Sequence, residues 1–211
     1  MALPVHAERR TGVGLDPDSD PDRGRNQREK PKVICWANRN GFYYLLDRIT
    51  GKFLVGTPFV EQNWTKGLDS AGRPIPLEEA RVSPAGRLTR PGVLGGTNWQ
   101  NAAFDHEKGL VFVHATEGAS VFTKSPEVRR GDGGVYLASA GSVVRPVVTV
   151  VRALDAATGT RRWERIAPPS NDVFLAYSGL LATDGDLVFG ASGTRVCSRL
   201  EDRSRVVARV P

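Results

Sequence analysis

The chain has 211 residues, and its 23 glycines and 14 prolines beside a single methionine favour a turn-rich β protein over a helical one. Its net charge of +6 comes from scattered basic residues, which is typical of a solvated surface, so we expect no nucleic-acid partner. No apolar run is long enough for a membrane span, and Met1 to Arg10 contain no apolar secretion core, so the chain as written would stay in the cytoplasm.

Residues 1–31 have no apolar period and many residues that break secondary structure, so we expect a disordered segment. A β-meander then begins, with strands expected over Val33–Ala37, Phe42–Leu46 and from Phe53. Residues 57–92 read as a long proline-rich connection with one helical turn near Leu77 to Ala80, and long ordered connections are often functional.

The second half of the chain also predicts strands and turns. The expected elements are a hairpin of 102–104 and 110–114, a strand over 147–154 and a hairpin over 180–190. Residues 115–145 read as irregular, and the charged tail from Arg195 loses the strand pattern. His114 ends a strand and is expected to be structural rather than a ligand.

Two stretches share the pattern Asp-x-x-Thr-Gly, namely Asp47–Gly51 and Asp155–Gly159. The Asp side chain accepts hydrogen bonds from the turn backbone, and Gly supplies the positive φ that closes the turn. Trp163 follows the second turn, where a large ring can pack between neighbouring sheets. Such a recurrence predicts repeated β-units, as in a propeller.

Three segments carry a resemblance to a known family: Trp36–Gly51, Pro91–Trp99 and Ala176–Gly190. They resemble the pyrroloquinoline quinone (PQQ)-dependent alcohol dehydrogenases, in the same order along the chain. The resemblance implies an all-β fold in which residues 32–194 form a partial β-propeller, about three to four blades from the C-terminal half of an eight-bladed ring. Because these are only part of the eight blades, the chain is expected to be a fragment. Residues 1–31 and a degraded tail, 195–211, lie outside the propeller.

The resemblance also implies three cofactor-binding residues. Arg39 matches the family's cation beside the quinone oxygens, and Asn98 matches an asparagine that hydrogen-bonds the quinone. Tyr177 falls where many members place a tryptophan that contacts the cofactor. Without the resemblance, Arg39 is a surface arginine in a turn and Asn98 a residue of a glycine-rich turn. The tryptophans Trp36, Trp99 and Trp163 are expected to pack in the core or between blades.

The implied function is oxidation of a small alcohol to an aldehyde with PQQ and a bound Ca²⁺ or lanthanide, passing electrons to a separate acceptor such as a cytochrome c. The parent family is periplasmic. Neither the family's catalytic aspartate nor its metal ligands find a match here, so we expect no catalytic residue and no metal ligand, and an isolated chain with little or no activity. The alternatives are a non-enzymatic propeller scaffold and a frameshifted or truncated relic.

A change of reading frame is one hypothesis for residues 1–31. With one permitted choice of codons, His6 to Pro17 read one base out of frame give a Trp-Asp stretch that resembles the family's catalytic segment. The nucleotide sequence tests this hypothesis directly, because the real codons either encode that motif in a shifted frame or do not.

Overall fold

Antiparallel strands account for nearly all regular structure in the computed structural model, which describes residues 32–124, 139–166, 179–183, 187–190, 196–200 and 205–209. Within these ranges there is no α-helix, and so no helix long and apolar enough to cross a bilayer. The elements are β1 (Val33–Ala37), β2 (Phe42–Asp47), β3 (Phe53–Pro58), β4 (Thr65–Leu68), β5 (Pro74–Pro76), the 3-10 turn η1 (Glu78–Ala80), β6 (Arg87–Thr89), β7 (Ala103–Asp105), β8 (Leu110–Lys124), β9 (Ser139–Asp155), β10 (Arg161–Ile166), β11 (Leu180–Ala182), β12 (Val188–Gly190), β13 (Val196–Leu200) and β14 (Arg205–Arg209).

The all-β prediction is confirmed, as are the meander β1–β2–β3, the helical turn at η1 and the hairpin β11–β12. Three predictions of irregular structure are wrong. The connection 57–92 contains β4, β5 and β6, and the described parts of the stretch 115–145 belong to β8 and β9. The tail beyond Arg195 contains the hairpin β13–β14. Residues 1–31, Tyr177 and the turn at Asp184 lie outside the described residues.

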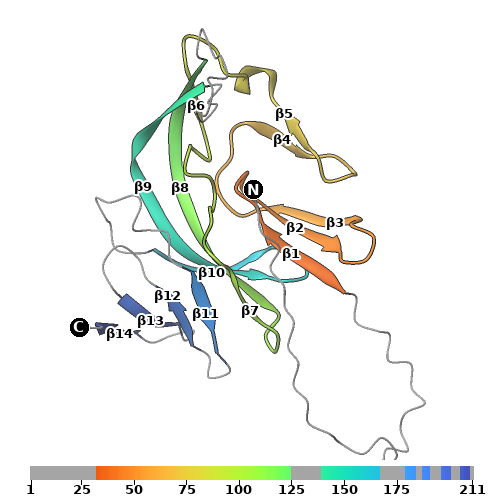
Figure 1. The fold of residues 1–211 in the computed structure, drawn as a ribbon, viewed down its shortest axis with the longest axis vertical. Coiled ribbons are helices and arrows are strands. Elements are labelled where there is room, and N and C mark those ends of the chain that lie inside the picture. The colour runs from red at the N-terminus through yellow and green to blue at the C-terminus, as the bar shows by residue number, and fades with distance from the viewer. Residues whose placement is uncertain are drawn as a thin grey trace, which may run out of the picture.

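The central sheet has the order β10-β9-β8-β6, with β7 also paired to β8, and it is covered on both faces around Val111–Val113 (Figure 1). Successive side chains of β8 point to opposite faces, as the strand geometry requires. Val111 and Val113 pack against Tyr43 of the β1–β3 sheet, whereas Phe112 packs against Leu180 of the β11–β12 hairpin. The layers are therefore held together by two separate apolar clusters on either side of one sheet.

Both Asp-x-x-Thr-Gly turns form as the sequence predicts. Asp47 Oδ1 accepts hydrogen bonds from the backbone and side chain of Thr50, and these bonds lower the pKa of the Asp47 carboxyl. Asp155 Oδ1 makes the same two bonds to Thr158. The second turn also docks on the neighbouring sheet, because Tyr43 Oη donates to the Ala156 carbonyl at 2.7 Å. It thereby joins two of the layers.

Arg152 on β9 forms a buried polar link between layers, with only 4% of the residue exposed. Its Nη1 lies 2.6 Å from Glu117 of β8, and its Nη2 lies 3.0 Å from Glu164 of β10. Nη1 also donates to the carbonyl of Phe59, just after β3. A buried guanidinium needs such partners because an uncompensated buried charge is strongly destabilising.

Candidate functional site

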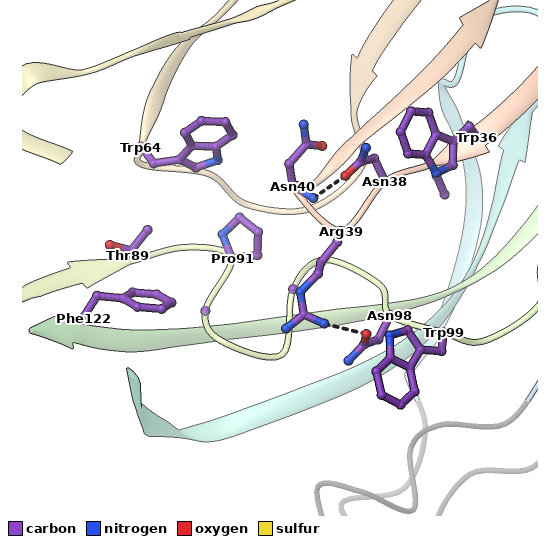
Figure 2. Close-up of a pocket in the computed structure, with 13 residues that line it drawn as sticks. Trp36, Asn38, Arg39, Asn40, Trp64, Thr89, Pro91, Asn98, Trp99 and Phe122 are labelled. Carbon is purple, nitrogen blue, oxygen red and sulfur yellow. Dashed lines mark hydrogen bonds between the residues drawn. The ribbon is translucent and has the colours of Figure 1, made fainter. Parts of the chain in front are cut away.

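An open pocket of about 660 Å³ lies where the turn after β1 meets the loop between β6 and β7 (Figure 2). Aromatic rings and amides surround one guanidinium group there. The lining residues are Trp36, Ala37, Asn38, Arg39, Asn40, Trp64, Thr89, Pro91, Gly92, Gly95, Asn98, Trp99 and Phe122.

The turn that carries Arg39 is shaped by its two asparagines. Asn38 Oδ1 accepts the Asn40 N–H at 2.9 Å, and Asn40 Oδ1 accepts the Phe42 N–H at 3.0 Å. Gly41 closes the turn with φ +94°, in the left-handed region that favours glycine. Side-chain oxygens that bond nearby backbone are typical of Asx turns, so the local sequence alone dictates this geometry. It projects the Arg39 side chain from the end of β1 into the pocket.

Arg39 and Asn98 are 59 residues apart in the sequence and lie in direct contact. Arg39 Nη1 donates to Asn98 Oδ1 at 2.5 Å, and Nη2 donates to the carbonyl of Val93. Figure 2 shows the guanidinium pointing toward Asn98 and the indole of Trp99. The structure thus brings two of the three candidate site residues together, and the third, Tyr177, lies outside the described residues.

The three tryptophans expected to pack in the core differ from one another. Trp163 does pack, 5.7 Å from the ring of Phe112 and against the cluster that joins β8 to β11 and β12. The ring of Trp36 lies 5.7 Å from that of Tyr44 at a tilt of 38°, and Trp36 also lines the pocket. The prediction is wrong for Trp99, which is 85% exposed and stands at the pocket wall beside Asn98. An aromatic ring left in solvent at a pocket is available to a ligand.

Trp64 and Phe122 line the pocket and were missed by sequence reasoning. Trp64 precedes β4 in a segment predicted as a connection, and Phe122 lies on the second half of β8 in a segment predicted as irregular. The run Ala119 to Thr123 is rich in β-branched and aromatic residues, and this signal would have extended the strand to include Phe122.

The pocket carries positive charge and hydrogen-bond donors but no carboxylate or histidine among its described lining residues. Across the described ranges, no group of three or more His, Cys, Asp or Glu side chains is placed to hold a metal ion. A guanidinium beside amides binds oxygen anions well, and indole rings offer flat apolar faces. The pocket is thus suited to a flat ring that bears anionic oxygens.

Comparison with known proteins gives a consistent set of relatives, although no family model matches the chain. The chain is 34% identical over 173 residues to quinoprotein alcohol dehydrogenase PedH of Pseudomonas putida, an alignment that covers 75% of this chain and 27% of PedH. It is 34% identical over 172 residues to lupanine 17-hydroxylase [cytochrome c] of a Pseudomonas species, covering 77% of this chain and 23% of that protein. The chain therefore spans about a quarter of the length of the curated relatives it matches.

Solved structures agree with the sequence relatives. A europium-containing methanol dehydrogenase superposes with a TM-score of 0.74 at 25% identity, over 85% of this chain and 32% of that one. The quinoprotein dehydrogenases of this kind are β-propellers, so the stacked sheets of Figure 1 are part of a propeller fold.

Proposed function

We propose that this chain, which belongs to the quinoprotein alcohol dehydrogenases, supplies part of a site where PQQ is bound and a small alcohol is oxidised to an aldehyde. The observation that carries the proposal is the contact between Arg39 and Asn98 inside a pocket walled by aromatic rings. These are the two described positions where the sequence matches the family's cofactor contacts.

The residues present fit such a cofactor. A guanidinium has five N–H donors, and the two hydrogen bonds to Asn98 and Val93 leave others for carboxylates or quinone oxygens. Because Asn98 Oδ1 is engaged by Arg39, the remaining amide Nδ2 can donate to a ligand. The exposed ring of Trp99 and the half-buried ring of Trp36 offer faces for a flat ring system.

The chemistry divides between the cofactor and the chain. PQQ, when bound, supplies the redox chemistry by accepting the two electrons that leave the alcohol. Arg39 would place a fixed positive charge beside the oxygens of the bound ring, and a charge already in place costs no reorganisation during the reaction. Asn98 holds that guanidinium through its Oδ1 and would orient the ligand edge through its Nδ2.

We assign the general base and the Ca²⁺ or lanthanide to residues other than the described ones, and derive no step through the metal. On this proposal the isolated chain has little or no alcohol dehydrogenase activity. Electrons would pass to a separate acceptor such as a cytochrome c, a term that appears in the name of one relative. A periplasmic location belongs to the same proposal. A fixed guanidinium in a pocket favours this function over a scaffold, which has no need of one.

A titration of PQQ into the 211-residue chain with Ca²⁺ present, followed by quenching of tryptophan fluorescence, tests the proposal. Arg39→Gln should weaken binding by about ten- to a hundredfold, since hydrogen bonds to charged groups contribute about 1.5–3 kcal/mol. Arg81→Gln is the matched control, because Arg81 is an exposed arginine beside η1 and away from the pocket lining.

Two results would contradict the proposal: no binding of PQQ by the unmodified chain, or equal affinity in the Arg39 variant. Alcohol oxidation by the purified chain with PQQ and Ca²⁺ would contradict the assignment of the base to other residues.

A further inference from the structure

The guanidinium of Arg39 is exposed yet held from one side by a single loop. We call Gly92–Asn98 the clamp loop, because both acceptors of the Arg39 side chain, the Val93 carbonyl and Asn98 Oδ1, belong to it. The loop also packs tightly against the Arg39 side chain, because a Cβ built on Gly95 would lie 2.4 Å from Arg39 Cγ. The orientation of the guanidinium therefore depends on where this loop lies.

The clamp loop is attached to the middle of β8 by three hydrogen bonds. Two of them join backbone groups: the Gly92 N–H to the Gly118 carbonyl at 3.0 Å, and the Thr116 N–H to the Gly96 carbonyl at 2.8 Å. The third is made by a side chain, since the Val93 N–H donates to Ser120 Oγ at 2.9 Å. That third bond holds Val93, the residue whose carbonyl accepts the hydrogen bond from Arg39 Nη2.

Ser120 is one of the most buried residues of the described chain, with 1% exposed, and does not line the pocket. The loop backbone lies directly on it, because a Cβ built on Gly92 would approach Ser120 Oγ to 2.6 Å. A larger side chain at position 92 would therefore move the loop, and loss of the hydroxyl at position 120 would leave the part-buried Val93 N–H without its acceptor.

We propose that Ser120 is a positioning residue for Arg39, acting through the backbone of Val93. Its hydroxyl holds the Val93 N–H, and residue 93 in turn presents its carbonyl to Arg39 Nη2. Arginine has a large rotamer entropy, so a guanidinium held in advance binds an anionic ligand with less loss of freedom. The part of this inference that concerns ligand affinity rests on the proposed function, whereas the part that concerns the pose of Arg39 does not.

The first measurement is ¹⁵N relaxation of the Arg39 Nε–H in the ligand-free 211-residue chain, with the resonance assigned from an Arg39→Lys variant. In Ser120→Ala the order parameter should fall toward the flexible range, below about 0.6. Thr116→Val is the matched control, because Thr116 is also buried on β8 and its contact with the clamp loop is made by the backbone N–H. An unchanged order parameter in Ser120→Ala would overturn the inference.

The second measurement is the PQQ titration in a double-mutant cycle. Ser120→Ala should weaken PQQ binding by about tenfold, and should have no further effect in an Arg39→Gln background. Equal weakening in both backgrounds would mean that Ser120 acts on the pocket without Arg39, and would overturn the inference. Absence of PQQ binding by the unmodified chain would count against the proposed function, while the relaxation result would still decide the role of Ser120.

A further variant keeps the test decisive if Ser120→Ala does not fold, as judged by circular dichroism. Gly95→Ala changes no residue of β8 and places a methyl group 2.4 Å from Arg39 Cγ and 2.7 Å from the Thr97 carbonyl oxygen, so the clamp loop must shift relative to Arg39. It should change the Arg39 Nε–H signal and weaken PQQ binding in the same background-dependent way. A folded Gly95→Ala chain with the Arg39 signal of the unmodified chain would overturn the role of the clamp loop.

Discussion

Alanine at Gly159 is expected to destabilise the chain more than alanine at Gly51, although the two glycines occupy equivalent turns. Both have φ +71°, and both donate their N–H to the carbonyl of the aspartate that starts the turn. A Cβ on Gly51 would meet nothing within 4 Å, whereas a Cβ on Gly159 would lie 2.5 Å from Tyr43 Cδ1 and 3.0 Å from Thr57 Cβ. The pair thus separates the backbone cost of the turn from its contact with the next sheet.

The two costs can be given magnitudes. Left-handed backbone costs an alanine about 1–2 kcal/mol, and this term is shared by both variants. Overpacking of a tight contact adds about 1–3 kcal/mol at Gly159 alone. The effect of Gly→Ala on the unfolded chain is also shared and cancels in the comparison. We therefore expect Gly159→Ala to lower the free energy of unfolding by about 1–3 kcal/mol more than Gly51→Ala.

Urea unfolding of the full chain, followed by circular dichroism and tryptophan fluorescence, measures this difference. The comparison uses the midpoints, provided that the dependence on urea is the same for both variants. If the two variants lose the same free energy of unfolding within about 0.5 kcal/mol, the reasoning is refuted, because the contact of the turn with the β1–β3 sheet would then contribute nothing.

Further changes have equally specific outcomes. Arg152→Met should lower the free energy of unfolding by about 2–4 kcal/mol in urea titrations, because it leaves the carboxylates of Glu117 and Glu164 without the buried guanidinium. Arg81→Met, at an exposed ion pair, should have little effect. Burial lowers the pKa of His114 from 6.5 to about 4, so the free energy of unfolding should fall by about 3 kcal/mol as the pH drops from 6.5 to 4. His114→Gln should flatten this pH dependence in urea titrations, and an unchanged dependence would contradict the assignment to His114. Trp99→Ala should leave stability within about 0.5 kcal/mol and weaken PQQ binding about tenfold, and unchanged affinity would exclude the indole from the site.

Features that depend on a few adjacent residues could be predicted from the sequence. The turns at Asp47 and Asp155 form as expected because a carboxylate, a hydroxyl and a glycine within five positions determine their own hydrogen bonds. The position of Arg39 in a turn follows from its asparagine neighbours in the same way. The proximity of Arg39 to Asn98 was implied only by the family resemblance, because local sequence patterns do not predict contacts between residues so far apart in the chain.

The missed strands have identifiable causes. In β8 the register shifts between Glu117 and Ala119, and Gly118 interrupts the alternation that would otherwise extend the strand. In β5 both ends are proline, which removes ladder donors and reads as a connection. The exposure of Trp99 could not be foreseen either, because it depends on what packs around a glycine-rich loop and not on the loop sequence.

The Arg39–Asn98 contact in the pocket joins two segments from different layers, the turn after β1 and the clamp loop on β8. A ligand that needs both segments binds only when those layers are stacked. By mass action, such a ligand stabilises the contact between the sheets by RT ln(1 + [L]/Kd), which is about 2.7 kcal/mol at a hundred times its dissociation constant. Binding of such a ligand and stacking of these sheets are therefore one coupled equilibrium, and each can be measured through the other.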